Sequence, residues 1–588
     1  MSAIGRHVLA TGFIACLLSV AAVAAENGPT TPPSQVRLAE WVGDDVGICL
    51  EVDNLGDEWS RFRESRLFEG LSRFPPVAEW FSQHGQEISL LSGEIERRTG
   101  VAARDVATKL LGRQALFAIW PPANPLTDKP AALLLAESTD GDLLRGALER
   151  LVEARRQAGR WRGRHTLHVA DETFSVEVVV PEEEQSEFFI TSLGDFAVFA
   201  SDERLLREVL QRRAGSGERG SLAASPAYLA AARRLGTADS VRLFTNPRAW
   251  DTALEADLKS KEPGSEEAES QAVIVAAWRA MRYVAGGVQL TPRLAVELAW
   301  EWRTDELPEP VREAAASLEG RSAFVDHLPD DALIAFAGHI DLKRLVRYWI
   351  EHKGREAHGK DPRDQLDSIL FWALAAGVGP DYGGFLRVST SEGGHTSVDL
   401  VAGLQTRPLE VESGRPPLAE SLEPVLHALL SSAVEAVNRQ AGTNVAAIRS
   451  TDHEGCRITS VVGIVPDRPG QELAYCVDRL GRLWFGSSAA AVELASLAKR
   501  AGGARPEEPL GGPSSLLSVN LAEFRKLAAG GQQAVDFLWE GKQLDARDKE
   551  REYQCLLAFS QLADRLVFAT RVDESTVHLS CVLDTNAR

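Results

Sequence analysis

The chain has 588 residues, a net charge of −20 and a pI near 5.2. So acidic a protein lacks the clustered Lys and Arg that nucleic acids and anionic membranes require, and we expect neither as a partner. Hydrophobic residues make up 44% of the chain and include 13 Trp, which indicates several well-filled cores.

Residues 1–25 predict a signal peptide. Arg6 and His7 give a short polar start, residues 8–23 are almost all apolar or small, and small residues precede Glu26. The alternative is an uncleaved anchor, because the apolar run is near the lower limit for spanning a membrane. We expect cleavage, with no membrane insertion afterwards, and therefore a periplasmic or extracellular protein. Residues 26–40 contain a Pro-rich polar stretch, and we predict that they form a spacer before the folded part of the chain.

A first domain is predicted over residues 41–302. It opens on the turn Asp44-Asp45, and the segment 193–215 is an apolar strand, a polar cap and a helix that ends in Gly. Asn246 followed by Pro247 predicts a helix start at the end of another strand. The expected elements are a strand over 46–53, a strand over 131–136, a helix over 142–157, strands over 173–180 and 187–191, the strand and helix within 193–215, and closing strands over 240–246, 283–290 and 293–302.

The same order returns over residues 324–584, after a linker at 303–323 that is rich in Pro and charge. Asp330-Asp331 repeats the opening turn, and 480–502 repeats the strand, cap and helix. Asn520 repeats the helix cap, with Glu523 three residues later. Because neighbouring strands joined by short turns pair antiparallel, we predict an α+β fold. It comprises two tandem, divergent copies of one domain, each a mostly antiparallel sheet covered by helices.

Two short segments carry a family resemblance. Ser201-Asp202-Glu203-Arg204 follows an apolar strand, and Ser221-Leu222 precedes Ser225-Pro226-Ala227-Tyr228. This pattern resembles the exported bacterial proteins that share domain of unknown function 3352. The second copy departs from it, with Ser488-Ala489-Ala490 at the first segment and no counterpart of Ser225-Pro226. The resemblance implies an exported α+β protein and no known active site.

Catalytic motifs are incomplete in the sequence. Ser496 and Lys499 have the Ser-x-x-Lys spacing of penicillin-recognising acyl-enzymes, and Ser518-Val-Asn520 matches their Ser-x-Asn. No Lys-Thr-Gly follows, however, and Asn520 already serves as a helix cap. An ordinary helix face is the preferred interpretation, with Ser496 and Lys499 kept as candidate catalytic residues.

Metal, phosphate and disulfide sites are also poorly supported. Asp44, Asp45, Asp330 and Asp331 are matched carboxylate pairs that could bind a cation, but Asp is favoured at turns for backbone hydrogen bonding. The Gly-rich segment 377–384 follows an apolar helical pattern, so we interpret it as a helix stop and turn. We expect no metal and no cofactor. Five cysteines follow the signal and suit small buried hydrophobes better than a disulfide framework, although one or two local bridges stay open: Cys49, Cys456, Cys476, Cys555 and Cys581.

These observations favour a non-enzymatic exported protein that binds or scaffolds in the cell envelope. Its partner would be an envelope protein, a glycan or a small molecule. The alternative is a periplasmic hydrolase whose residues come from distant segments.

Overall fold

The fold comes from a computed structural model, which divides the chain between Pro308 and Glu309 into an N-terminal unit and a C-terminal unit. This division falls inside residues 303–323, which were predicted to be a linker. The described residues are 37–122, 129–180, 187–217, 220–235, 240–259, 261, 264–291, 293–344, 378–390, 396–406, 418–453, 456–463, 472–478, 480–497, 512–531, 535, 539 and 545–585.

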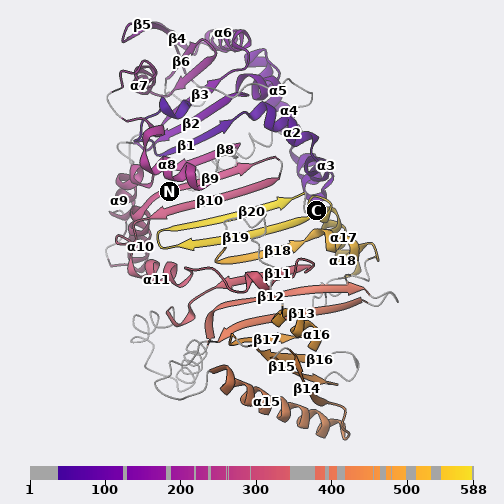
Figure 1. The fold of residues 1–588 in the computed structure, drawn as a ribbon. Helices are drawn as coiled ribbons and strands as arrows, with labels where there is room; N and C mark the ends of the chain where they lie inside the picture. The colour runs from indigo at the N-terminus through magenta and orange to yellow at the C-terminus, as the bar shows by residue number, and fades with distance from the viewer. Residues whose placement is uncertain are drawn as a thin grey trace. The chain divides into compact units, whose positions relative to one another are not determined.

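The described part of the N-terminal unit forms one antiparallel sheet, and its strands are ordered β4-β5-β6-β7-β3-β2-β1-β8-β9-β10 (Figure 1). The bounds are β1 Ile48–Asp53, β2 Gln114–Trp120, β3 Ala131–Glu137, β4 Trp161–Val169, β5 Glu172–Val179, β6 Phe188–Leu193, β7 Phe196–Ala200, β8 Val241–Thr245, β9 Met281–Gln289 and β10 Leu294–Trp302. The helices are α2 Leu55–Glu64, α3 Arg66–Arg73, α4 Pro75–Thr99, α5 Ala103–Asp105, α6 Gly141–Gln157, α7 Glu203–Arg213, α8 Pro226–Leu235, α9 Asp251–Lys259 and α10 Glu266–Ala280.

The described part of the C-terminal unit forms a second antiparallel sheet, ordered β14-β15-β16-β17-β13-β12-β11-β18-β19-β20. Its strands are β11 Ile334–His339, β12 Val378–Thr390, β13 Thr396–Thr406, β14 Ala447–His453, β15 Cys456–Val462, β16 Glu472–Val477, β17 Arg482–Gly486, β18 Ser515–Asn520, β19 Arg565–Asp573 and β20 Thr576–Asp584. Its helices are α11 Glu309–Ser317, α15 Leu418–Ala441, α16 Ala489–Leu497, α17 Leu521–Ala528 and α18 Ala546–Ser560.

The predicted α+β class is confirmed, and the strand order is the same in both units when β1 is matched with β11 and each later strand with its successor. The register matches as well. Leu50 on β1 pairs with Leu243 on β8, and Phe336 on β11 pairs with Leu517 on β18 at the corresponding positions.

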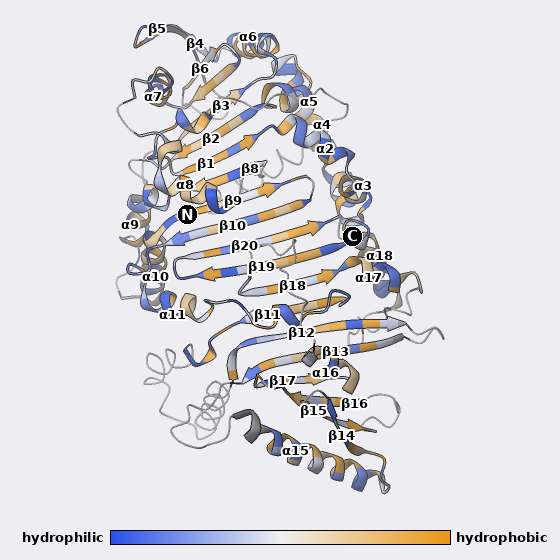
Figure 2. Cartoon of the chain, in the orientation of Figure 1, coloured by the Kyte–Doolittle hydropathy of each residue, from blue (hydrophilic) through white to orange (hydrophobic). Residues whose placement is uncertain are grey.

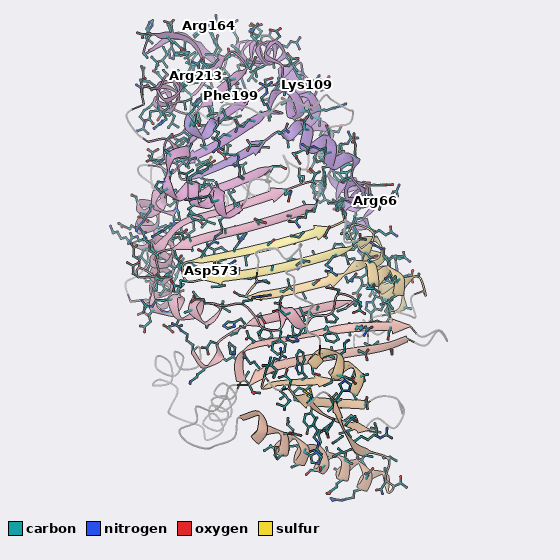
Figure 3. All side chains as sticks on the ribbon, viewed as in Figure 1. Arg66, Lys109, Arg164, Phe199, Arg213 and Asp573 are labelled. Carbon is teal, nitrogen blue, oxygen red and sulfur yellow. The ribbon has the colours of Figure 1, made fainter. Side chains whose placement is uncertain are left out.

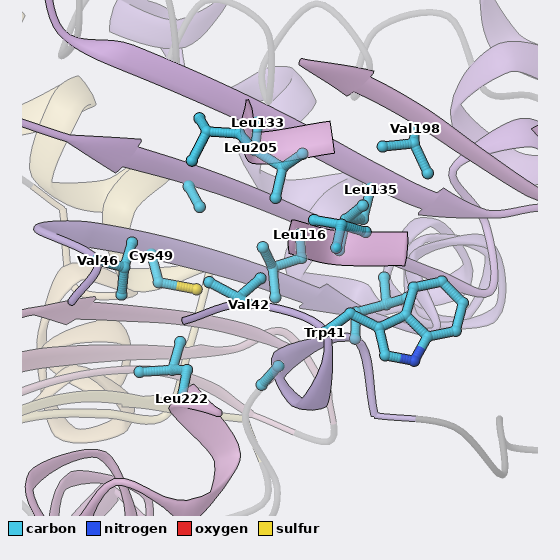
Figure 4. Close-up of a cluster of buried hydrophobic side chains, with 14 of the residues drawn as sticks. Trp41, Val42, Val46, Cys49, Leu116, Leu133, Leu135, Val198, Leu205 and Leu222 are labelled. Atoms are coloured by element: carbon cyan, nitrogen blue, oxygen red, sulfur yellow. The ribbon is translucent and has the colours of Figure 1, made fainter. Parts of the chain in front are cut away.

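Each sheet packs one face on a buried core. In the N-terminal unit, Cys49, Leu116 and Leu133 of the central strands lie with Leu206 and Leu210 of α7 in a cluster that is almost wholly buried (Figure 4). In the C-terminal unit, Val401 and Trp484 occupy the corresponding face, together with Val492 of α16. Because successive strand residues point to opposite faces, the residues between these core positions form a second face, called here the outer face.

The sequence interpretation of the Gly-rich segment 377–384 was wrong, because residues 378–384 belong to β12 rather than to a helix stop and turn. Its glycines serve close packing instead. A Cβ at Gly383 would meet Phe324 Cβ at 2.6 Å, and one at Gly384 would meet the Phe336 ring at 2.9 Å. Glycine therefore makes room for aromatic rings on both faces of this strand.

None of the described helices is both long and apolar enough to cross a membrane.

Candidate functional site

Ser496 lies on α16, half-buried against the core of the C-terminal unit. Its Oγ donates to the carbonyl of Glu493 at 3.0 Å, within the same helix, and it also hydrogen bonds with the thiol of Cys476. These contacts suit an ordinary helix residue. Lys499, the other half of the motif, lies outside the described residues.

The two Asp pairs form matching turns at the start of β1 and β11. Asn246 Nδ2 donates to the carbonyl of Asp44 at 3.4 Å, and Asn520 Nδ2 donates to the carbonyl of Asp330 at 3.1 Å. Each Asn also caps the next helix through its side-chain oxygen. The Asn therefore ties a helix start to the turn before a neighbouring strand in both units.

The second Asp of each pair has a partner of its own. Asp45 Oδ1 accepts from Trp120 Nε1 at 3.0 Å, and Asp331 Oδ2 pairs with Arg387 Nε at 2.9 Å. Within the described ranges, no group of three or more His, Cys, Asp or Glu side chains is placed to hold a metal ion.

A buried ionic cluster in the N-terminal unit has no counterpart among the residues selected from sequence. Glu51 on β1 is 3% exposed, and the hydroxyl of Tyr228 on α8 donates to its Oε2 at 2.6 Å. Arg242 on β8 lies 3.5 Å from the same oxygen and also pairs with Asp53, which accepts from Gln114 Nε2 at 2.9 Å.

Burial dominates the electrostatics of this cluster. It raises the pKa of the Glu51 carboxyl, and the nearby Arg242 guanidinium offsets only part of that effect. Burial also raises the pKa of the neighbouring Cys49 thiol well above its usual value, with a further contribution from Glu51. A thiol held protonated in this way is a poor nucleophile, so the cluster supports packing better than covalent catalysis.

The C-terminal unit has a different buried ionic group. Arg482 on β17 donates to Asp478 Oδ2 at 2.6 Å and contacts His327, and Trp484 Nε1 donates to the same Asp478 oxygen at 3.2 Å. The matching positions in the N-terminal unit are Trp41 and Phe196, whose ring centroids lie 4.9 Å apart. An apolar contact in one unit is thus a polar contact, between His327 and Arg482, in the other.

The described cysteines are thiols, with no disulfide among Cys49, Cys456, Cys476, Cys555 and Cys581. Cys49, Cys456 and Cys476 are buried in the two cores, and burial raises the pKa of the Cys476 thiol. Their packing agrees with the interpretation of these three residues as small buried hydrophobes.

The outer faces differ from all these clusters because their central strands have no charged residue at the positions below. In the N-terminal unit, three positions on each of six strands contain only apolar residues, glycine and one threonine: Ile48, Leu50, Val52, Ala115, Phe117, Ile119, Ala132, Leu134, Ala136, Val241, Leu243, Thr245, Val284, Gly286, Val288, Val296, Leu298 and Trp300. The matching positions of the C-terminal unit are Ile334, Phe336, Gly338, Tyr382, Gly384, Leu386, Leu400, Ala402, Leu404, Ser515, Leu517, Val519, Leu566, Phe568, Thr570, Leu579, Cys581 and Leu583.

A row of directly paired residues crosses each outer face. In the N-terminal unit the row is Ile190, Phe199, Leu134, Phe117, Leu50, Leu243, Gly286 and Leu298, of which Phe199 is labelled in Figure 3. In the C-terminal unit it is Tyr475, Phe485, Ala402, Gly384, Phe336, Leu517, Phe568 and Cys581. Figure 2 shows hydrophobic residues recurring along the strands of both sheets.

Helices cover only parts of these faces. Leu55 of α2 packs with Val52 and Val241, and α17 and α18 pack with Ile334 and Leu386. Large apolar side chains elsewhere on the faces are open to solvent: Leu243 at 36%, Leu298 at 37%, Val296 at 46%, Leu400 at 55%, Leu404 at 37%, Leu517 at 40% and Phe568 at 44%. A half-solvated antiparallel sheet normally alternates apolar and polar residues, so these uncharged central positions with exposed leucines make the outer face a candidate binding surface.

This surface could not be predicted from the sequence. The alternation of residues that predicts a strand does not reveal which face is covered, and the row is visible only once the strand register is known.

The chain matches no protein-family model, and no curated protein or solved structure shows significant similarity to it.

Proposed function

We propose that this is a non-enzymatic exported protein that binds a partner through its outer faces. One observation carries the proposal: both sheets expose large apolar side chains on the central strands of the outer face, where the eighteen positions compared in each unit include no charged residue, and Leu243 and Leu517 are exposed at the same register position. Such a surface favours an apolar partner over a glycan, because a glycan needs many hydrogen-bonding groups and these positions offer few hydroxyls: Thr245 in one unit, and Tyr382, Ser515 and Thr570 in the other.

The export part of the proposal rests on residues 1–25, which have the polar start, apolar run and small-residue ending of a signal peptide. We also propose that the units are two divergent copies of one domain and that the chain is similar to the family of domain of unknown function 3352. The matching strand orders and turns support the first idea, and the segment from Ser201 to Tyr228 supports the second.

Binding of an apolar fluorescent dye tests the proposed surface. Leu517→Asp and Phe568→Asp place charges on the outer face and should remove most of the fluorescence that anilinonaphthalene sulfonate gains with the wild-type chain. Leu429→Asp is the matched control, because Leu429 on α15 is 63% exposed and lies outside the face. Equal dye binding by Phe568→Asp and Leu429→Asp would contradict the proposal.

The hydrolase alternative has a direct test. A fluorophosphonate or penicillin probe should not label the chain at Ser496, whose hydroxyl is engaged within α16. Labelling that disappears in Ser496→Ala would replace the binding proposal with an enzymatic one.

A further inference from the structure

Two cysteines are neighbours on the core face of the C-terminal unit. Cys456 begins β15 and Cys476 lies near the end of β16, and these strands pair antiparallel with Ile458 opposite Cys476. Cys456 is two residues from Ile458, so it points to the same face and is a diagonal neighbour of Cys476. Both side chains are buried, with Cys456 7% exposed and Cys476 0% exposed.

The two thiols are also in contact. The thiol of Cys456 hydrogen bonds with that of Cys476. The Cα atoms of diagonal neighbours on antiparallel strands are about 7 Å apart, which is near the upper limit that a disulfide spans, so the direction of the side chains decides whether a bond is feasible. Among the described residues, the pairing of β15 with β16 ends at Ile458 and Cys476. Cys456 can therefore move toward β16 without breaking a hydrogen bond of that ladder.

The fold itself does not require thiols at these positions. Ile190 and Tyr475 occupy the same place in their rows, so the residues of the N-terminal unit that match Cys456 and Cys476 are Phe174 and Thr191. Both are buried, and Thr191 Oγ1 donates to the carbonyl of Ser175 at 2.9 Å. A phenyl ring and a hydrogen-bonded hydroxyl fill the same space, so packing alone does not explain a pair of cysteines in the other unit.

We propose that Cys456 and Cys476 are an oxidation site, at which a disulfide joins β15 to β16. The structure describes the reduced form of the pair. The bond would close a loop over residues 456–476 and so restrict the unfolded chain, which is how a disulfide stabilises a fold. This inference goes beyond the proposed binding function and does not depend on it.

The oxidant is itself a disulfide, either of a small thiol or of a thiol–disulfide oxidoreductase. The thiolate of one cysteine attacks a sulfur of the oxidant, which forms a mixed disulfide and releases one reduced thiol. The other cysteine then attacks the mixed disulfide, the bond between Cys456 and Cys476 forms, and the second thiol of the oxidant leaves. The pair loses two electrons and two protons, and the oxidant gains them.

Burial determines when the bond forms. It raises the pKa of the Cys476 thiol, and the thiolate is the form that attacks a disulfide. The folded, reduced pair should therefore oxidise slowly, and the bond should form mainly while the chain folds. Oxidising compartments lie outside the cytosol, so formation of the bond in the source cell rests on the export proposed above.

Peptide mapping tests the proposal on the purified full chain, refolded from urea in mixtures of oxidised and reduced glutathione. Iodoacetamide blocks free thiols before digestion. Trypsin cuts after Arg449 and Arg457, so Cys456 and Cys476 lie on different peptides that only a disulfide holds together. Wild type should give this linked pair, about 2 Da lighter than the sum of the two reduced peptides. The linked pair should form more slowly when the chain is folded before the oxidant is added.

Urea unfolding measures the effect of the bond. Reductant should lower the unfolding midpoint of the oxidised wild-type chain and leave that of Cys476→Ser unchanged, because the variant cannot close the loop. Cys555→Ser is the matched control and should keep both the linked pair and the response to reductant. Cys456→Phe/Cys476→Thr takes the residues of the N-terminal unit and replaces the single variant if serine perturbs folding.

Absence of the linked pair at every ratio of the two glutathiones would overturn the proposal. A bond from either cysteine to Cys555 or Cys581 in the refolded chain would overturn it as well. A linked pair in the refolded chain, combined with free thiols at both positions in protein taken from its source, would support the site and contradict export.

Discussion

Glu51 illustrates how single residues are placed by contacts that are far apart in the sequence. It is a carboxylate on the core face of β1, and its hydrogen-bond partner Tyr228 is 177 positions away. Buried charges need such partners, because water is not there to solvate them.

The titration of Glu51 gives the first prediction. Burial raises its pKa above the value of about 4.3 expected for an unfolded chain, so its contribution to stability is complete below that value and declines as the pH rises through the folded-state pKa. Glu51→Gln keeps an oxygen for Tyr228 but does not titrate. The variant should therefore gain stability relative to wild type as the pH rises from about 4 to 7.

Urea unfolding of both proteins at several pH values measures this difference. A constant difference across the range would mean that Glu51 has the same pKa in the folded and unfolded states. Glu177→Gln, which removes a carboxylate from β5, is a control for the general effect of lost charge.

The sequence predicted the caps at Asn246 and Asn520 because a cap depends on its own side chain and on backbone within three residues. It could not predict that each Asn also donates to the turn at Asp44 or Asp330, since those contacts bridge about 200 positions. Nor could it place Glu51, which lies in a segment where polar and apolar residues mix.

At the scale of elements, the turn that follows β7 and β17 is the same in both units. The amide of Ser201 donates to the carbonyl of Ala132 at 2.9 Å, and its Oγ accepts from the Ala132 amide at 2.8 Å. Ser487 makes the same two bonds with Leu400, each at 2.9 Å. A serine at this position therefore extends the pairing between two strands by one residue.

This equivalence gives the second prediction. Ser201→Ala and Ser487→Ala should each destabilise the chain by about 1 kcal/mol, because a strand amide loses its acceptor in both variants. Chemical denaturation measures the effect, with the exposed Ser192→Ala as control. A cost in one unit and none in the other would show that the two turns are not equivalent.

Strands flanked by clear turns were predicted well, and β12 was not. The glycines Gly379, Gly383 and Gly384 predict a turn, because several glycines close together usually mark one. In the fold, Gly383 and Gly384 accommodate Phe324 and Phe336, which lie in a segment more than 45 residues away. Local propensity fails where a distant side chain sets the requirement.

At the scale of the whole molecule, two units share a strand order and a register, yet their polar interactions have diverged. Trp41 and Phe196 in one unit correspond to His327 and Arg482 in the other. The central strands of the outer face have no charged residue at the compared positions of either unit, although individual residues differ. We infer that the face has a role beyond folding.

The third prediction concerns export. If residues 1–25 are removed as a signal, the native chain begins at Glu26, and mass spectrometry of the protein from its source should give that N-terminus. Detection of Met1 on chains that stay in a salt-washed membrane fraction would show that the segment is an anchor instead.

The outer face is the centre of this account, and photo-crosslinking in living cells tests it most directly. A benzoylphenylalanine placed at position 517 or 243 should form adducts, because these side chains are exposed on the two faces. The same probe at positions 429 and 90, which are exposed on helices α15 and α4, should form few. The mass of the adducts would identify the partner. Adducts that are absent at 517 and 243, or as frequent at 429 and 90, would contradict the assignment of the outer face as the binding surface.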